Sequence, residues 1–456
     1  PRRVSYGWGS RSGDEAQFES MLKRCRKAGV DVYVDAVLNH MASGSGVGVA
    51  GTRFGDRTYP LYTPSDFHHA HGDSSYNCGV SDYGDKWNVQ YCDLLGLPDL
   101  CTRCPLVQGV MASYLNTLER HGVAGIRIDA AKHQDADELR GVLSRINTST
   151  YRYLEVIENV GEAVVASMYL PDMGDVTEFA YAWEVAPAIS GRGQLRDLVG
   201  LRETFSRRKP AAVPSSNAVV FIDNHDTQRG IAPLTYKSGA PYVLASVFML
   251  AYPYGYPMVM SSYSFDSNDQ GPPREAVHRP RSHGHGALRC GDAKPWVYEH
   301  RCPAIANMVA WRKWAQDEPV NHVQATDDNT LFFCRGREAC VALNRHPRNM
   351  WRAHLLASLP PGKYCDIIRS TSKTCPRIIV GLDSKTWLEV PPMGAIAMHA
   401  GARVGDVPTQ ELSAHASSSK ASTPQLSAMA PLPGTAALLA VCVSVAAAGF
   451  GLVSCR

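Results

Sequence analysis

The chain has 456 residues, of which 45% are hydrophobic, and a formal net charge of +3 from 46 basic and 43 acidic side chains. This length allows two or three domains, and the composition is that of an ordinary globular protein with a large core. The charge is close to balance and no run of lysine and arginine occurs, so we do not expect nucleic acid as a partner.

The first half of the chain alternates predicted helices and strands. Ser12 and Glu15 have the spacing of a capping box, and apolar residues from Phe18 to Cys25 follow at helical spacing until Gly29 ends the helix. Residues 41–98 lose this rhythm, which indicates a segment inserted after a strand. The predicted strands are Val30–Leu38, Ala124–Ile128, Tyr153–Ile157, Ala218–Asp223 and Met258–Ser262, and the predicted helices between or after them include Val110–Leu118, Ala136–Ile146, Val243–Leu250 and Ile305–Trp314. Such alternation indicates an α/β barrel or a doubly wound sheet.

The pattern changes to short strands separated by turns after residue 317. This pattern predicts a separate antiparallel β domain, followed by a low-complexity linker. The predicted strands are Thr330–Cys334, Cys340–Leu343, Tyr364–Ile368, Arg377–Val380, Trp387–Val390 and Ala395–His399.

The two ends of the chain predict export to the cell surface. The chain starts at Pro1 without a signal peptide, so we expect its true start to be missing. Residues 435–453 form an uncharged apolar run of membrane-spanning length, preceded by the small residues 417–422 and a spacer. This layout favours a GPI-attachment signal over a retained helix, because only one basic residue follows the run.

Thirteen cysteines also favour an oxidising compartment. For Cys101 and Cys104 zinc is the competing interpretation, but no second close pair flanks them at finger spacing. We therefore predict disulfides. The pairs suggested by proximity are Cys78 with Cys92, Cys365 with Cys375, and Cys290 with Cys302.

Polar clusters follow the predicted strands, where the catalytic groups of a parallel barrel gather. A single Asp in such a place would more simply cap the next helix, but four clusters on successive strands indicate a site. The clusters are Asp35 with Asn39 and His40, Arg127 with Asp129, Lys132 and His133, Glu155 alone, and Asp223 to Asp226.

These four segments resemble the ordered signature segments of the α-amylase family of glycoside hydrolases. They read DAVLNH from Asp35, GIRIDAAKH from Gly125, EVI from Glu155 and FIDNHD from Phe221. Later segments, such as YPYGY from Tyr252, resemble the animal type, and the similarity covers roughly residues 4–400. It begins just before the helix that precedes the third barrel strand, so we expect the first two strands to be absent.

The resemblance implies a (β/α)8 TIM barrel with an inserted excursion domain and a C-terminal antiparallel β domain of Greek-key type. The expected layout is barrel in 1–40, calcium-binding excursion in 41–98, the rest of the barrel in 99–317, a β-sandwich in 318–402, linker in 403–434 and the hydrophobic tail in 435–456.

The resemblance also assigns roles to individual residues. Asp129 matches the catalytic nucleophile and Glu155 the general acid/base, while Asp226 matches a third carboxylate that binds and distorts the sugar. Arg127 is expected to hold the nucleophile ionised. The remaining residues that match substrate-binding positions are His40, Lys132, His133, Glu162 and His225.

A calcium site and a chloride site follow from the same match. Asn39 and Asp99 with the backbone carbonyls of Gln90 and His133 form an all-oxygen set of the kind that Ca²⁺ takes. Arg127 and Asn224 match two chloride ligands. The third, normally basic, position is occupied by Met258, whose thioether cannot hold an anion, so we predict chloride-independent activity.

The activity implied by the resemblance is endohydrolysis of α-1,4-glucosidic bonds in starch, glycogen and maltooligosaccharides by a secreted or surface-tethered monomer. Two alternatives stay open. One is an α-glucosidase with an exo-acting pocket, and the other is a catalytically idle homologue that acts as a cell-surface binding protein.

Overall fold

The structure of the chain is a computed structural model. It describes residues 13–48, 51–55, 57–70, 77–146, 150–201, 212–273, 295–370, 372, 374–406, 442–445 and 452–455. The start of the chain, Cys290, the small residues 417–422 and most of the predicted linker lie outside these ranges.

The larger part of the described chain is built on an eight-stranded sheet in the order β18-β19-β1-β4-β5-β6-β7-β8. Six of the strands run parallel from β1 to β8, each beside the next in the order given. Their bounds are β1 Tyr33–Val37, β4 Gly125–Asp129, β5 Tyr151–Leu154, β6 Asp175–Thr177, β7 Ala218–Val220 and β8 Tyr256–Pro257. Helices α1 Glu15–Lys27, α3 Pro105–His121, α4 Ala136–Leu143, α5 Ala180–Ile189, α7 Ala240–Ala251 and α8 Pro303–Ala315 accompany them. These strands and helices confirm the predicted barrel architecture.

An antiparallel hairpin of β18 (Cys442–Val445) and β19 (Leu452–Cys455) continues this sheet beyond β1, where Leu452 pairs with Val34. Both strands lie within or just beyond the apolar run predicted as an anchor. In the part of the chain that the structure describes, no helix is long and apolar enough to cross a membrane. The anchor stays a prediction.

Helix α1 shows how local sequence fixes the helix ends. Its N-cap is Asp14, whose carboxylate accepts the Gln17 N–H at 2.9 Å, while the Gln17 side chain accepts the Asp14 N–H. The predicted capping box of Ser12 and Glu15 is therefore wrong, because the helix begins later. Helix α3 begins with Pro105 and ends at Gly122, whose φ of 91° suits a left-handed C-cap.

The predicted strand Met258–Ser262 is also wrong. The neighbouring strand β8 ends at Pro257, and the following apolar residues continue as buried irregular chain. The Ser262 N–H donates to the Glu299 carboxylate at 2.6 Å instead of to a neighbouring strand. The apolar sequence therefore predicted correctly that these residues are buried, but it did not predict correctly that they form a strand.

The inserted segment 41–98 carries few regular elements: β2 Gly46–Val47, β3 Arg53–Phe54 and α2 Lys86–Tyr91. The Cys78–Cys92 disulfide cross-links it. A backbone bridge between His40 and Asp99 joins its two ends at the barrel.

The C-terminal domain is a sandwich of a four-stranded sheet, β16-β11-β10-β9, and a five-stranded sheet, β12-β15-β14-β13-β17. Six strands were predicted, and β9, β12 and β17 were not. The bounds are β9 Val320–Gln324, β10 Thr330–Arg335, β11 Ala339–Asn344, β12 Trp351–Leu356, β13 Gly362–Cys365, β14 Arg377–Val380, β15 Lys385–Val390, β16 Gly394–His399 and β17 Arg403–Gly405. Strand β17 extends the sandwich into the segment predicted as linker.

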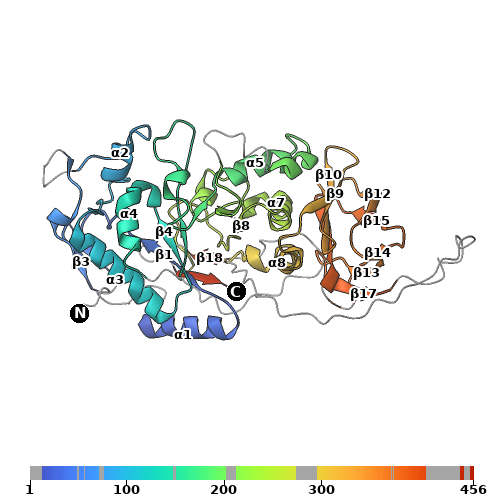
Figure 1. Cartoon of the computed structure of the whole chain (residues 1–456), viewed down its shortest axis with the longest axis horizontal. Helices are drawn as coiled ribbons and strands as arrows, with labels where there is room; N and C mark the ends of the chain where they lie inside the picture. The colour runs from blue at the N-terminus through green and yellow to red at the C-terminus, as the bar shows by residue number, and fades with distance from the viewer. Residues whose placement is uncertain are drawn as a thin grey trace, which may run out of the picture.

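Figure 1 shows the sandwich at one end of the molecule and the barrel at the other, with α7 and α8 between them. Both helices contact β11 and β16. The five-stranded sheet therefore forms the outer layer of the sandwich.

The predicted disulfides Cys78–Cys92 and Cys365–Cys375 are confirmed. Cys101 and Cys104 form a disulfide, which decides between the two interpretations of that pair, and a further disulfide joins Cys334 to Cys340. Cys302 is disulfide-bonded as well. These bonds favour an oxidising, extracellular compartment.

Candidate active site

The predicted catalytic residues lie where the parallel strands end. Asp129 is the last residue of β4, and Glu155 directly follows the last residue of β5. Asp226 lies in the loop after β7, at the N-cap of a short 3-10 helix, Thr227–Arg229. The side chains of Asp129, Glu155 and Asp226 are 20%, 10% and 58% exposed, so Asp226 is open to solvent while Glu155 is largely buried.

Arg127 connects two of these carboxylates. Residues two apart on a strand share a face, so the side chains of Arg127 and Asp129 both point into the barrel. The Arg127 Nη1 atom donates to Asp129 Oδ1 at 2.7 Å and to Asp35 Oδ1 at 2.6 Å. Its Nη2 atom forms an ion pair with Glu155 Oε1 at 2.8 Å. Asp35 and Arg127 are paired residues of the neighbouring strands β1 and β4, which explains the contact between their side chains.

The acid–base balance of the site follows from burial and from these charges. Burial raises the pKa of Glu155, Arg127 opposes the rise, and the nearby carboxylates of Asp129 and Asp226 add to it. The pKa of Asp35 is raised by burial in the same way. Burial would lower the pKa of Arg127, but Glu155, Asp35 and Asp129 raise it well above its usual value. The arginine therefore keeps its positive charge beside a glutamate whose pKa is raised.

Backbone hydrogen bonds also hold two of the predicted catalytic carboxylates, Glu155 and Asp226. The Ala130 N–H donates to Glu155 Oε2 at 2.9 Å. The amide oxygen of Asn224 accepts the N–H groups of Asp226 and Thr227 at 3.0 and 2.8 Å, which caps the turn that carries Asp226.

Lys132 and Glu162 form a second polar group beside the carboxylates. Lys132 Nζ donates to Glu162 Oε2 at 2.6 Å and to the Ile157 carbonyl at 2.6 Å. The Lys132 ammonium also lies 4.6 Å from the centre of the Tyr83 ring. Burial would raise the pKa of Glu162, but hydrogen bonds from Lys132 and Asn159 lower it. Tyr83, which the sequence did not single out, brings the excursion next to this pair.

The predicted histidines lie around the same site. His225 Nε2 is 3.1 Å from Asp226 Oδ2. Burial lowers the pKa of His40, although the charge of Asp129 opposes this, so His40 is neutral at neutral pH. His133 is buried, its Nδ1 lies 2.9 Å from the Val89 carbonyl, and burial lowers its pKa to about 4.

Three of the candidate calcium ligands, Asn39, Asp99 and His133, lie together. One terminal atom of the Asn39 amide lies 3.3 Å from Asp99 Oδ1 and 2.9 Å from the His133 carbonyl oxygen. Gln90 is close by, since its side chain donates to the Gln134 carbonyl at 3.1 Å. Burial and the Asp93 carboxylate raise the pKa of Asp99 well above its usual value. A buried set of carboxylate, amide and carbonyl groups fits a hard divalent cation.

The position expected to complete a chloride site holds a thioether. Met258 is 9% exposed and packs with Tyr153, whose hydroxyl donates to the Met258 sulfur at 3.8 Å. Arg127 forms an ion pair with Glu155, so Glu155 neutralises part of the positive charge that would otherwise attract an anion.

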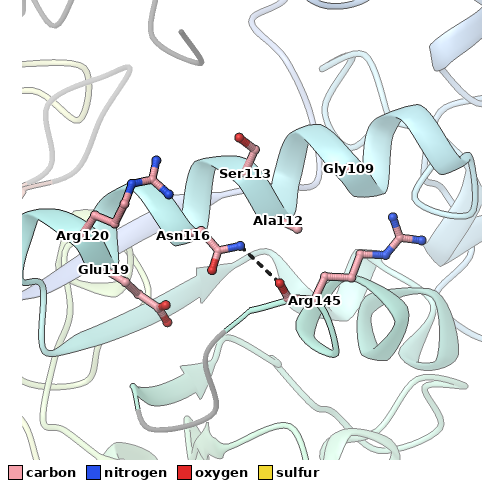
Figure 2. A pocket seen from close by; sticks show the side chains of 7 residues that line it. All are labelled: Gly109, Ala112, Ser113, Asn116, Glu119, Arg120 and Arg145. Carbon is pink, nitrogen blue, oxygen red and sulfur yellow. Dashed lines mark hydrogen bonds between the residues drawn. The ribbon is translucent and has the colours of Figure 1, made fainter. Parts of the chain in front are cut away.

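A hollow of 550 Å³ lies elsewhere, along the outer side of α3 (Figure 2). None of the predicted site residues lines it. Within it Asn116 donates to the Arg145 carbonyl at 3.2 Å. Its lining residues are Gly109, Ala112, Ser113, Asn116, Glu119, Arg120 and Arg145.

A parallel barrel with paired carboxylates at its strand ends has the arrangement that glycoside hydrolases use. Comparison with known proteins agrees. The α-amylase catalytic domain matches residues 9–186, and the α-amylase C-terminal all-β domain matches residues 321–401. The chain belongs to the α-amylase family.

Its relatives come from bacteria and animals. The chain is 39% identical to an α-amylase of Streptomyces violaceus over 89% of its own length and 67% of that protein. It is 34% identical to the α-amylase-related protein of Drosophila pseudoobscura pseudoobscura over 88% of its own length and 83% of that protein. The crystal structure of α-amylase I from Eisenia fetida superposes with a TM-score of 0.77 at 32% identity, covering 87% of this chain and 86% of that one. A variant of the same Eisenia fetida enzyme is known in complex with maltohexaose, with a TM-score of 0.75.

Proposed function

We propose that the chain is an α-amylase that cleaves internal α-1,4-glucosidic bonds of starch, glycogen and maltooligosaccharides with retention of anomeric configuration. The observation that carries this proposal is the single guanidinium of Arg127, which contacts both Asp129 and Glu155. The contact supports the proposed roles of Asp129 as the nucleophile and of Glu155, whose pKa is raised by burial, as the acid. This pairing is what double displacement requires.

In the first step the Asp129 carboxylate attacks the anomeric carbon and forms a glycosyl ester. The glucosidic C–O bond breaks, and Glu155 gives its proton to the leaving oxygen. In the second step Glu155, now a carboxylate, takes a proton from water. The water oxygen attacks the anomeric carbon and releases Asp129.

The surrounding residues bind and orient the sugar. Asp226 and His225 lie on the β7 loop and are expected to hold ring hydroxyls at the cleaved bond. Lys132 and Glu162 are expected to hold the leaving side. Arg127 is expected to act through Asp129 and Glu155, two of the three carboxylates that it contacts.

Replacement of Glu155 by Gln tests the assignment. Because a general acid contributes about 10²–10⁴-fold, E155Q should lose at least that factor in kcat on maltoheptaose, and D129N should lose a similar factor. Proton NMR of the first product should show the α-anomer. An initial β-anomer would refute retention, and an active E155Q would refute the role of Glu155. A spread of oligosaccharides early in starch digestion distinguishes endo-hydrolysis from an α-glucosidase.

We further propose that Asn39, Asp99 and the carbonyls of Gln90 and His133 hold a calcium ion. Calcium would supply structural charge there and would take no part in bond cleavage. His68 supports the proposal, because its Nδ1 lies 2.5 Å from Asp99 Oδ2 and so orients the carboxylate. The protein is proposed to act outside the cell as a monomer, secreted or tethered to the surface.

A further inference from the structure

A buried pair of carboxyl groups adjoins the turn that carries Asp226, and the proposed mechanism uses neither of them. Asp223 and Glu299 are 1% and 0% exposed. Asp223 directly precedes Asn224, whose amide oxygen accepts the Asp226 N–H at 3.0 Å. Glu299 begins the short 3-10 helix Glu299–Arg301. A movement of Asp223 would therefore move the turn that presents Asp226.

Each carboxyl group is anchored through only one of its two oxygens. The Tyr242 hydroxyl on α7 donates to Asp223 Oδ1 at 2.9 Å. The Ser262 N–H donates to Glu299 Oε2 at 2.6 Å. Among the residues that the structure describes, the other oxygens, Asp223 Oδ2 and Glu299 Oε1, have no hydrogen-bond partner and are shielded from solvent. Buried polar atoms are rarely left unpaired, so each of these oxygens requires a donor.

The groups that act on the pair bring no positive charge to it. Glu299 is the charged group that most raises the pKa of Asp223. In the part of the chain that the structure describes, no cation contributes to the pKa shift of either carboxyl, although His300 and Arg301 directly follow Glu299. Two adjacent carboxyl groups without such a cation do not both stay ionised. The other titratable groups that interact with the pair are tyrosines, Tyr236 and Tyr242.

Burial and this charge arrangement keep protons on the pair. Burial raises the pKa of Asp223 well above its usual value, and it raises the pKa of Glu299 to about 7 although contacts with Ser262 oppose the rise. After the first proton is lost, the remaining one is held more tightly, because its loss would leave two like charges side by side. A carboxyl that keeps this proton is a donor, so one O–H···O bond between Asp223 and Glu299 would satisfy both unpaired oxygens.

We propose that Asp223 and Glu299 share a proton, and that the resulting hydrogen bond holds the turn from Asn224 to Asp226 in its sugar-binding position. This inference rests on the proposed function, because Asp226 is the carboxylate expected to bind the sugar. Glu299 is thereby a positioning residue that acts through Asp223. Loss of the last proton leaves two buried negative charges, and their repulsion displaces Asp223 together with the turn that follows it. Since the pKa of each group is raised in the folded state, this stabilisation is complete below the pKa of the unfolded chain and is lost as the pH rises above about 7.

Calorimetric binding of maltoheptaose at several pH values tests the proposal in the full chain carrying E155Q, at fixed calcium concentration. This background removes hydrolysis and the titration of Glu155. Between pH 7 and pH 9.5, where histidines of ordinary pKa are largely neutral, the apparent Kd should rise at least fivefold, because only the protonated pair presents Asp226 correctly. Adding E299Q should reduce this rise to less than twofold and leave Kd at pH 7 within twofold, because the glutamine amide donates to Asp223 without titrating.

Two further variants separate positioning from the general loss of a buried group. E299A offers Asp223 no donor, so it should already weaken binding at least fivefold at pH 7. D366N is the matched control, since Asp366 is buried in the C-terminal domain with a pKa raised to about 6, and it should leave the pH dependence of binding unchanged. If E299Q does not fold, D223N carries the same test from the other side of the pair, because its amide donates to Glu299.

A Kd of the E155Q chain that stays constant from pH 7 to pH 9.5, or a rise that persists in E299Q, would overturn the proposal. Binding by E299A that equals the parent at pH 7 would also overturn it. Melting temperatures give a readout that needs no sugar: E299Q should gain stability relative to the parent between pH 7 and pH 9.5, and an equal pH dependence of the two would refute the shared proton. Hydrolysis by E155Q would instead refute the catalytic assignment alone, since the melting comparison does not depend on it.

Discussion

Replacing Arg127 with Met removes the one cation that contacts three carboxylates in the site. The Arg127 side chain is 4% exposed, and its distances to Asp35, Asp129 and Glu155 are 2.6–2.8 Å. Breaking a buried ion pair on one side costs about 3–5 kcal/mol, because the remaining charge is left uncompensated. With about 2–4 °C per kcal/mol for a domain of this size, the melting temperature should fall by roughly 6–20 °C.

The loss should depend on pH in a direction that the structure fixes. Burial already raises the pKa of Asp35 and of Glu155, and Arg127 opposes the rise. In R127M both pKa values rise further. A carboxyl whose pKa is higher in the folded state binds its proton more readily there. Its stabilising contribution is therefore complete below the unfolded pKa and is lost as the pH rises through the folded pKa. The difference between R127M and the parent should be largest at pH 8 and should shrink towards pH 5.

Calorimetry at fixed calcium concentration, at pH 5 and pH 8, measures both effects. R140M is the control, because Arg140 contacts Asp172 at 2.8 Å and Asp137 on the exposed surface. It should melt close to the parent at both pH values, since exposed ion pairs contribute little. A melting temperature of R127M within about 2 °C of the parent at pH 8 would refute the reasoning. An equal loss at pH 5 and pH 8 would refute the electrostatic explanation.

The remaining predictions concern ions and the leaving side of the site. Activity in chloride and in acetate should agree within about twofold, because Met258 cannot bind an anion, and strong stimulation by chloride would contradict this. Without a bound anion the pKa of Glu155 is lower than with one, so we expect a pH optimum on the acid side. E162Q should raise KM for maltoheptaose more than it lowers kcat, because Lys132 loses its carboxylate partner; an unchanged KM would count against the subsite. EDTA should lower the melting temperature of the parent much more than that of D99N, and equal sensitivity of the two would exclude Asp99 as a calcium ligand.

Much of the site was predictable because its residues directly follow apolar runs that form strands. Asp129 ends its strand and Glu155 follows the next, so an apolar run before each marked its position. The contact between Arg127 and Asp35 was not predicted as such, since it depends on the register of β1 against β4. Tyr83 was missed because it lies in an irregular segment, where no periodicity indicates which side chains point towards the barrel.

Fold prediction failed where the physical signal is ambiguous or weak. The run from Met258 to Ser262 is buried, but hydrophobicity alone does not distinguish a paired strand from a buried loop. Strand β17 has three residues and lies largely exposed, so it gives almost no hydrophobic pattern. Strand β6 is equally short, and its position follows only from pairing with β5 and β7.

The candidate calcium site and the proposed catalytic acid, Glu155, are closer than their sequence positions suggest. His133, whose carbonyl faces Asn39, directly follows Lys132, and the Lys132 N–H donates to the Glu155 carbonyl at 3.2 Å. The two sites are therefore linked through two consecutive residues of one short 3-10 helix, Ala131–His133. Asp99 brings the end of the inserted segment to the same helix. A cation that holds Asp99 and His133 together thus fixes both the docking of the inserted segment and the backbone against which Glu155 is placed, so calcium should act on catalytic rate as well as on stability.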